Sequence, residues 1–388
     1  MLLLTNEDVR QVLTMRKCLE AVEESTLRAG RGQLLKWDAG RLLEEKGGFG
    51  GSGSAYALRL NPVFDLVDGL VILRINSWAT IGVERFGKKR QVLVPAAGDR
   101  NPHRSEKPGW LHLYSMGTGR LLSVIQDRDV QVMRVGAVGA LAAKYMAKAD
   151  ASTIGLIGAG WMANTLLSAH VLVRDIRRVN VYSPNPEHRA AFCEQMTKQL
   201  GMDIIPVSSA QEAVRGAHML ISATNSSEPT FDADWVEPGT HVYCVTGAEY
   251  DERIVRKADR IAWSFPESSA YDSQADDTRL SDDPQKDKLA AREDGYAGYR
   301  ISGWKLLERY AGKRAYLSEM IEGRTKGRTS DDEITLSPSP AGGSAHVVRF
   351  CVLVPMVYEQ AKKRGIGRDL ADDWFHQETE TYPVFQLK

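Results

Sequence analysis

The sequence predicts an α/β protein in which a doubly wound parallel sheet is joined to an α+β N-terminal domain. From about residue 129, apolar strands alternate with helical stretches, which is the pattern of βαβ units. Before that point a helical stretch leads into β-rich runs that are separated by Gly-containing turns. These two patterns indicate a mostly β first domain followed by a parallel-sheet domain.

The composition narrows the class of protein. The 388 residues include 50 Lys plus Arg and 50 Asp plus Glu, so the formal net charge is zero. This balance lacks the basic excess of a typical duplex-binding domain, and no run approaches the roughly 18 apolar residues of a membrane helix. The four cysteines form no CxxC pair, which argues against structural zinc and disulfides. We therefore expect a cytoplasmic protein with no metal, nucleic-acid or membrane partner.

The first element is predicted to be one helix, capped by Thr5 or Asn6 and ending near Gly30. The run 66–75 holds two apolar stretches around an Asp-Gly pair and predicts a hairpin. The segment 82–108 is charged and contains Pro and Gly, so we expect a loop there.

A second hairpin is predicted over 109–127, with its turn at 117–119. A small-residue helix follows over about 128–149. Strands and helices then alternate, with one strand directly before Gly158, further strands at 179–184, 203–209, 218–225 and 240–247, and a helix at 186–200. The acidic, polar stretch 265–310 predicts an insertion that is either a solvated loop or lid or a partner surface. An apolar helix over 347–365 closes the pattern.

The glycine motif after the first of these strands carries the chemistry. Gly158, Gly160 and Ala163 form GxGxxA between an apolar strand and a helix, with Trp161 and Met162 at the head of that helix. The first glycine permits a tight turn, the second admits a pyrophosphate, and the small third residue lets the helix pack closely. Because a second strand follows about 20 residues on, the context favours dinucleotide binding in a Rossmann domain over a plain strand–helix turn.

The end of the second strand bears on the choice of dinucleotide. An NAD site usually has a carboxylate there, but this chain has Ser183, followed by Asn185 and Arg189. Hydroxyl, amide and guanidinium groups can bind a 2′-phosphate, so we expect NADP, with NAD as the alternative. The competing interpretation is that Arg189 is an ordinary solvated residue in the first turn of a helix.

Small polar residues also end the later strands. Ala223, Thr224 and Asn225 follow one strand, and Thr246 follows the next. Ligands of doubly wound sheets lie beyond the carboxyl ends of the strands. We therefore expect these four residues to line the path from the adenosine to the nicotinamide.

Several segments in the same order resemble the ornithine cyclodeaminase/mu-crystallin family, which includes archaeal-type alanine dehydrogenases and ketimine reductases. They are LTMRKCLEAVEES, RVGAVGALAAKYMA, TIGLIGAGWMANTLLSAH, ISATNSSEP, DWVEPGTHV and LSEMIEGRTKGRTSDDEITL. The resemblance covers most of the chain. It implies a Rossmann domain at 129–333 and a substrate-binding and dimerisation domain made of 1–128 and 334–388, in a homodimer. It also implies an amino or imino acid substrate whose carboxylate is held by arginine.

Site residues carry over unevenly from the resemblance. Arg134 matches the arginine of the family's Arg-Thr-Gly-Ala helix, and its fork suits a carboxylate. Arg59 matches an earlier carboxylate-binding arginine, or is an ordinary strand residue. Arg74 stands where the family has a catalytic lysine, and since arginine does not release a proton, it can bind an anion but is in doubt as an acid or base.

The remaining candidates concern proton transfer. Glu249 aligns either with the cyclodeaminases' catalytic aspartate or with a glutamate further along the family's chain, because the loop after the strand is shortened. His112 and Tyr114 lie in a strand, where a histidine is more often structural. Trp78, just after the strand that carries Arg74, is a candidate wall of the substrate pocket.

These residues favour reduction of an imine, or interconversion of an amino acid with its imino or keto acid, by an NAD(P)-dependent enzyme. Hydride transfer to a protonated imine needs a hydride donor and an anion clamp but little general acid. The alternatives are a lyase of the ornithine cyclodeaminase type and a non-enzymatic protein that binds NADPH and a small ligand, as mu-crystallin does.

Overall fold

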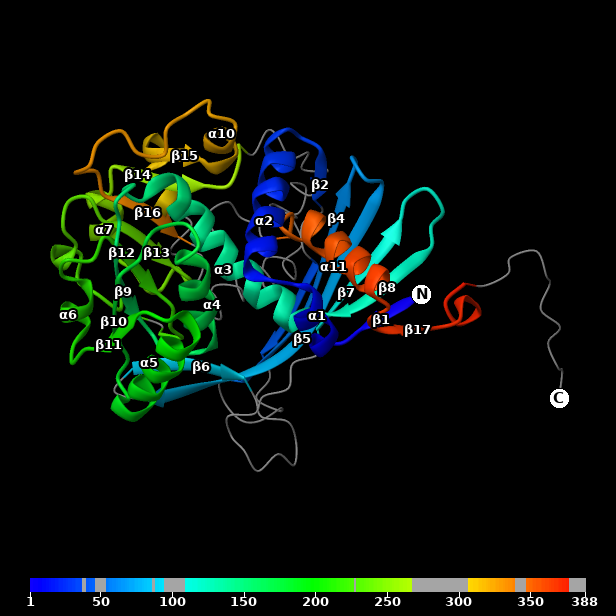
Figure 1. Cartoon of the computed structure of the whole chain (residues 1–388), viewed down its shortest axis with the longest axis horizontal. Coiled ribbons are helices and arrows are strands. Elements are labelled where there is room, and N and C mark those ends of the chain that lie inside the picture. Colours follow the sequence, from blue (N-terminus) through cyan, green and yellow to red (C-terminus); the bar gives the residue numbers. More distant parts are fainter. Residues whose placement is uncertain are drawn as a thin grey trace.

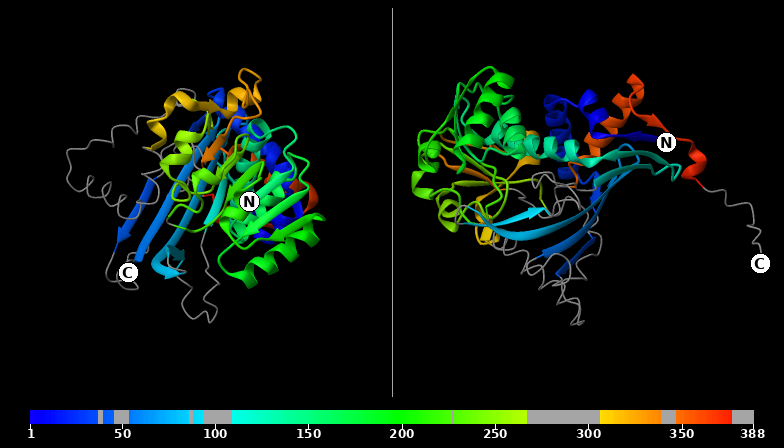
Figure 2. Two further views of the ribbon diagram at one scale, coloured as in Figure 1. Left: turned by 90° about the vertical axis from the view of Figure 1, so that its left-hand side faces the viewer. Right: turned by 90° about the horizontal axis from the view of Figure 1, so that it is seen from below.

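The computed structural model describes residues 1–36, 40–45, 54–85, 88–93, 109–226, 228–266, 306–338 and 347–376. The described strands form two sheets, one toward each end of the molecule, and the longest strand of the first sheet, β5 (Leu70–Arg85), extends toward the second (Figure 1). Helix α3 (Asp127–Met146) runs between them, and it contacts β7 of one sheet and β13 and β16 of the other (Figure 2). This confirms the predicted combination of a mostly β N-terminal unit with a Rossmann sheet.

The first sheet has the strand order β17-β1-β8-β7-β5-β4-β2, with β3 paired to β4 and β6 paired to β5. Its strands are β1 (Leu2–Leu4), β2 (Leu34–Lys36), β3 (Gly40–Glu45), β4 (Ser54–Asp65), β5 (Leu70–Arg85), β6 (Lys88–Leu93), β7 (Gly109–Ser115), β8 (Leu121–Gln126) and β17 (Arg368–Asp369). Helices α1 (Asn6–Val12), α2 (Met15–Gly30) and α11 (Phe350–Arg364) share one apolar core with this sheet. Helix α11 lies directly on β4, β5 and β7.

Three predictions for this region need correction. The first helix is two helices, because Leu13 is extended and the Thr14 side chain accepts a hydrogen bond from the Lys17 amide to begin α2. The hairpin at 66–75 exists, but its first strand is β4 and the residues 66–69 form the turn. The expected loop 82–108 contains the end of β5 and all of β6, whose pairing outweighs the local charge; 94–108 lie outside the described residues.

The second sheet has the order β11-β10-β9-β12-β13-β16-β14-β15, and every neighbouring pair is parallel. Its strands are β9 (Thr153–Ile157), β10 (Arg178–Tyr182), β11 (Asp203–Pro206), β12 (Met219–Ser222), β13 (His241–Cys244), β14 (Arg260–Trp263), β15 (Arg314–Tyr316) and β16 (Thr335–Pro338). Helices α4 (Trp161–His170) and α5 (Pro186–Leu200) share the core on one face, and α6 (Ala210–Val214) and α7 (Glu252–Lys257) share the core on the other. The chain reverses its winding between β9 and β12, which makes a topological switch point.

The last part of the chain returns to the first sheet later than expected. Strand β16 pairs with β13 and β14, although it lies beyond residue 333, where the sequence placed the end of the Rossmann domain. Short helix α10 (Leu317–Ile321) precedes it and packs on α2 and α3. Helix α11 ends as predicted at Gly365, which has a left-handed conformation. The predicted insertion 265–310 falls mostly outside the described residues.

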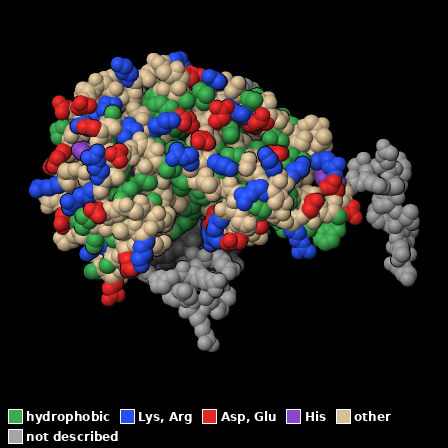
Figure 3. All heavy atoms as spheres, in the orientation of Figure 1, with side chains coloured by type: hydrophobic (Ala, Val, Ile, Leu, Met, Phe, Trp, Pro, Cys, Tyr) green, Lys and Arg blue, Asp and Glu red, His purple; other side chains and the backbone are tan. Residues whose placement is uncertain are grey.

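The surface mixes charges of both signs. On the face shown in Figure 3, basic and acidic side chains alternate over both lobes. Among the described helices, none is long and apolar enough to cross a membrane.

Candidate functional site

Four parallel strands end at the same edge of the second sheet, and most of the predicted cofactor residues follow them directly. Gly158 follows β9 and Ser183 follows β10; Ala223 and Thr246 come after β12 and β13. Ile157 pairs with Ser222, so the ends of β9 and β12 lie side by side at the switch point. The structure therefore brings these residues to the place where doubly wound sheets bind ligands.

The glycine loop fits a pyrophosphate. Gly158 has φ = 113°, and a Cβ there would lie 2.2 Å from the carbonyl oxygen of Ala223, so no other residue fits. Gly160 precedes α4 without any side-chain cap, and nothing lies within 4 Å of the position of its Cβ. No side chain therefore caps the first amides of α4, and the space beside Gly160 is open, as dinucleotide binding requires.

The remaining residues of the motif, Trp161 to Ala163, form the first turn of α4. Ala163 is fully buried against the sheet, which accounts for the small third residue of the motif. Met162 is half-buried, and Trp161 is 62% exposed at the head of the helix. An indole so exposed on a helix start is available to a ligand.

At the end of β10, the side chain of Arg189 contacts the backbone of Ser183. Ser183 is nearly buried, and its carbonyl oxygen accepts a hydrogen bond of 2.5 Å from Nη1 of Arg189. The Arg189 guanidinium also lies 5.6 Å from the ring centre of Tyr182. Asn185 caps α5 by accepting from the amide of His188. No carboxylate occupies position 183, and a guanidinium is held beside it.

Glu249 is placed differently from the prediction that it handles protons. Its carboxylate is fully buried and accepts hydrogen bonds from the amide and hydroxyl of Thr224, at 2.5 and 2.8 Å, and from the amide of Thr246 at 2.9 Å. Burial raises the pKa of Glu249, and these donors oppose the rise. It therefore joins the ends of β12 and β13 as a positioning residue, and we withdraw it as a catalytic candidate.

Two further predicted residues, Asn225 and Thr246, lie near Glu249 after the ends of β12 and β13. Asn225 is exposed, and the buried hydroxyl oxygen of Thr246 has no hydrogen-bond partner in the described part of the chain. An unpaired buried hydroxyl is costly unless a ligand or water pairs with it. Thr246 is thus suited to a polar group at the strand end.

A second group of residues lies between the two sheets. Arg74 of β5 is 2% exposed, and its Nε and Nη2 both donate to one oxygen of Asp127, at 2.9 and 2.7 Å. Arg134, on α3, is 5% exposed and donates to Gln131. Both guanidinium groups pack on the ring of Phe350, at 5.6 and 5.4 Å from its centre.

The sequence analysis missed a third arginine in this group. Arg349 is 2% exposed and directly precedes α11, and its Nη2 donates to the Ser264 hydroxyl at 2.5 Å just after β14. The sequence feature that could have identified Arg349 is its position as a lone basic residue inside the apolar run VVRFCVLVP. We refer to Arg74, Arg134 and Arg349 together as the arginine cluster.

Burial, and for Arg134 also repulsion between like charges, disfavours the charged form of arginines in the cluster. Burial, together with the charges of Arg74 and Arg349, lowers the pKa of Arg134 to about 9. Burial lowers the pKa of Arg349 to about 10. Helix α3, which carries Arg134, contacts β13, the strand that leads to Thr246, and the phenol of Tyr243 in β13 acts electrostatically on both Arg134 and Arg349. The arginine cluster therefore lies close to the strand edge that carries the predicted cofactor residues.

Other predicted residues lie elsewhere. His112 pairs with Leu73, and the buried Leu111 pairs with Arg74, so His112 points to the opposite face of the sheet from the cluster. Its ring stacks with Tyr114, and burial lowers its pKa. We therefore withdraw His112 as a proton donor at this site. The side chains of Arg59 and Trp78 lie outside the described residues.

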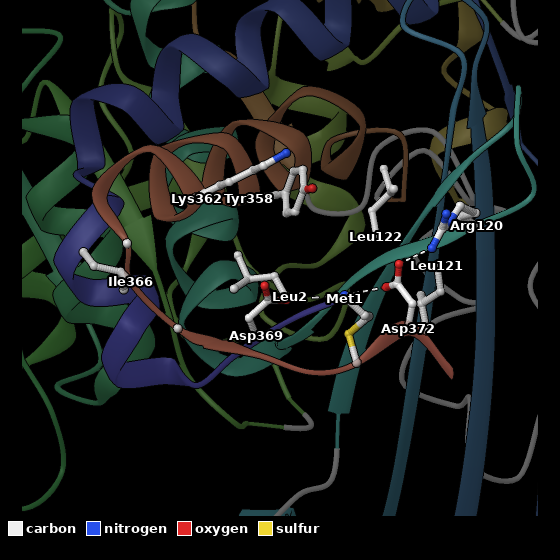
Figure 4. A pocket seen from close by; sticks show the side chains of 12 residues that line it. Met1, Leu2, Arg120, Leu121, Leu122, Tyr358, Lys362, Ile366, Asp369 and Asp372 are labelled. Atoms are coloured by element: carbon white, nitrogen blue, oxygen red, sulfur yellow. Dashed lines mark hydrogen bonds and ion pairs between the residues drawn. The ribbon is translucent and has the colours of Figure 1, made fainter. Parts of the chain in front are cut away.

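A pocket of about 430 Å³ lies at the other end of α11 (Figure 4). Leu2, Leu122, Tyr358 and Lys362 line it. Lys362 is 13 residues beyond Arg349, which is about 20 Å along a helix. The pocket is separate from the cluster. In the described ranges no three His, Cys, Asp or Glu side chains come together as a metal site.

Comparison with known proteins decides the family. The model of the ornithine cyclodeaminase/mu-crystallin family matches residues 103–365. The chain belongs to the ornithine cyclodeaminase/mu-crystallin family. A Δ1-pyrroline-2-carboxylate reductase from Bacillus cereus is 24% identical over 291 residues, which are 74% of this chain and 80% of the relative. The alanine dehydrogenase of Archaeoglobus fulgidus is 29% identical over 264 residues, 66% of this chain and 71% of that one.

Solved structures of the family share the whole architecture. The Δ1-pyrroline-2-carboxylate reductase of Thermococcus litoralis, in complex with NADH and L-proline, is 25% identical with a TM-score of 0.70. The similarity covers 95% of this chain and 100% of that one. The resemblance inferred from the sequence is thereby confirmed, and so is the fold. The oxidoreductase class expected from the sequence also agrees with these relatives.

Proposed function

We propose that this protein is an NAD(P)-dependent oxidoreductase that acts on CH–NH or CH–NH₂ groups, reducing an imine or interconverting an amino acid with its imino or keto acid. The observation that carries the proposal is a buried guanidinium clamp, Arg134 beside Arg74, next to the strand edge that fits a dinucleotide. The named relatives, a pyrroline-carboxylate reductase and an alanine dehydrogenase, support the same reaction class.

In the proposed reaction, Arg134 and Arg74 have different roles. A bound nicotinamide dinucleotide supplies or accepts the hydride. Arg134 binds the substrate carboxylate, with its buried Nε available for a second hydrogen bond. Arg74 is fixed by Asp127 and stabilises negative charge without transferring a proton. In reduction, the imine carbon gains the hydride and the C=N π electrons pass to a nitrogen that already carries its proton.

We propose NADP as the preferred dinucleotide and NAD as the alternative. Position 183 bears no carboxylate to repel a 2′-phosphate, and Arg189 lies beside it. The structurally similar reductase was solved with NADH, so the choice depends on the residues of this chain rather than on that relative.

The assembly and the domain limits are proposals as well. We infer a homodimer from the family resemblance, and light scattering should give about twice the 43.0 kDa of one chain. We also propose that residues 1–128 and the segment from α11 onward form the substrate domain, with the Rossmann domain extending through β16. A location in the cytoplasm stays a prediction.

One assay tests the reaction. The pure protein is given NADPH or NADH with 1-pyrroline-2-carboxylate, and separately with α-keto acids plus ammonium, and oxidation of the reduced nicotinamide is followed by absorbance. We expect turnover in at least one pair, and Arg134→Met should reduce it by about 100-fold or more, because the carboxylate loses its buried partner. Tight dinucleotide binding without turnover of any imine would refute the enzymatic proposal, and ammonia release from ornithine would indicate the lyase instead.

A further inference from the structure

The arginine cluster holds more positive charge than the described residues around Arg134 and Arg349 neutralise. Among the ion pairs of the described residues, Asp127 is the one carboxylate that contacts the cluster, and it binds Arg74. Arg134 and Arg349 donate to the neutral side chains of Gln131 and Ser264. Two buried positive charges are thus left without a counter-charge in this part of the structure.

The donors of these two arginines are also incompletely used. Among the described residues, Nε of Arg134, and Nε and Nη1 of Arg349, are buried without a hydrogen-bond partner. A buried charge without a partner is among the costliest features of a protein interior, and a chain keeps it where a ligand supplies the partner. The unused nitrogens therefore indicate an anion at each arginine.

The position of Arg349 connects its anion to the same site. It precedes the first residue of α11, Phe350, on whose ring both Arg74 and Arg134 pack. Its hydrogen bond to Ser264 anchors it at the carboxyl end of β14, on the edge of the sheet where the dinucleotide loop lies. Because Arg134 packs on the Phe350 ring and Arg349 is the neighbouring residue in the chain, the two arginines meet at the same end of α11, where one ligand can contact both.

We propose that the substrate is a diacid: an α-imino or α-amino acid whose α-carboxylate binds Arg134 and whose second acidic group binds Arg349. This inference rests on the proposed function and adds the substrate class. A monoacid would neutralise one of the two uncompensated charges, whereas a diacid neutralises both. The second acidic group binds without reacting, so the reaction needs no further reactant.

Binding of unreactive acids to the dinucleotide-loaded protein tests the inference without turnover. Calorimetric titration compares butyrate with malonate, succinate and glutarate, which vary the spacing of the two carboxylates. We expect at least one diacid to bind about 10-fold or more tightly than butyrate. Arg349→Met should weaken that diacid by about 100-fold and change butyrate by less than about threefold, since each buried charge pair is worth that much on truncation.

Two further variants sharpen the result. Arg349→Lys keeps the charge and should restore part of the diacid binding, and it serves as the test if the methionine variant does not fold. Lys363→Met removes an exposed positive charge from the same helix and should leave both affinities unchanged. Equal binding of mono- and diacids, or equal losses of both in Arg349→Met, would overturn the diacid assignment.

Kinetics separate this inference from the proposed function. Oxaloacetate and 2-oxoglutarate with ammonium are compared with pyruvate and 2-oxobutyrate, each with the preferred reduced dinucleotide. A higher kcat/KM for a diacid supports the inference, and faster turnover of the monoacids overturns it while the reductase function stands. If no acid is turned over, the proposed function fails, but diacid binding that depends on Arg349 still supports the second acidic subsite.

Discussion

Replacing two neighbouring arginines by the same residue should change stability in opposite directions. Arg134→Met removes a buried charge that has no carboxylate partner among the described residues, whereas Arg74→Met leaves the buried carboxylate of Asp127 without its partner. Methionine fills a similar volume and packs on Phe350 in either position. The two variants therefore differ mainly in the charge that each leaves behind.

The magnitude follows from the pKa of Arg134, which folding lowers from its ordinary value to about 9. At about 1.36 kcal/mol per unit, this shift corresponds to a folding penalty on the order of 5 kcal/mol. Between these pH values the unfolded chain binds the extra proton, so stability rises with pH there, and below about pH 9 the penalty has its full size. Lost hydrogen bonding offsets part of the gain, and we expect Arg134→Met to raise the free energy of unfolding by about 1–4 kcal/mol.

The assay is thermal unfolding of the ligand-free protein at neutral pH, with circular dichroism or calorimetry as the readout. Arg134→Met should raise Tm by a few degrees, and Arg74→Met should lower stability by about 3–5 kcal/mol. Substrate-type acids should bind more weakly to the stabilised Arg134→Met variant. A lower Tm for Arg134→Met than for the wild type would refute the reasoning that the cluster stores uncompensated charge for a ligand.

Three further predictions concern the second sheet. Gly158→Ala should lower the free energy of unfolding by about 1–3 kcal/mol and abolish dinucleotide binding, because the new Cβ would meet the carbonyl of Ala223. Gly160→Ala should keep the wild-type Tm but bind NADH at least about 10-fold more weakly than the wild type. Equal Tm values for the two variants would contradict this prediction. Arg189→Ala should weaken NADPH more than NADH in a titration of cofactor fluorescence, and equal effects would remove the 2′-phosphate argument. Burial lowers the pKa of His170 from 6.5 to about 4, so the unfolded chain binds more protons than the folded chain between these pH values. This residue should therefore lower the free energy of unfolding by about 3 kcal/mol as the pH falls through that range. In His170→Gln the decrease of Tm at acid pH should be shallower, and an unchanged slope would contradict the assignment.

The sequence predicted those parts of the site that depend on local pattern. Gly158, Gly160 and Ala163 are fixed by a strand, a turn and a helix that are neighbours in the chain, and all three lie as expected. The partner of Arg74 is Asp127, 53 residues away, and the ring between the arginines comes from Phe350. Such contacts depend on how two sheets and α11 pack together, which periodicity does not report.

The two errors at the site have the same origin. His112 alternates with apolar residues, which identifies a strand but not which face of the sheet turns toward the site; the pairing of Leu111 with Arg74 decides that. Glu249 follows a strand that leads to the cofactor edge, but its carboxylate turns back to the amides of Thr224 and Thr246. A carboxylate at a strand end can serve the backbone as readily as a substrate.

In the proposed reaction, the arginine at position 74 bears on where the proton comes from. A lysine there could release a proton to the imine nitrogen, whereas an arginine does not act as an acid or base. The guanidinium of Arg74 is instead held by Asp127, so the site has a fixed positive charge at this position. The imine must then arrive protonated. We therefore expect kcat/KM for reduction to fall above a pH that equals the pKa of the imine used, and this midpoint should move when one imine is replaced by another of different basicity. A common midpoint for two such imines would show that a group of the protein supplies the proton.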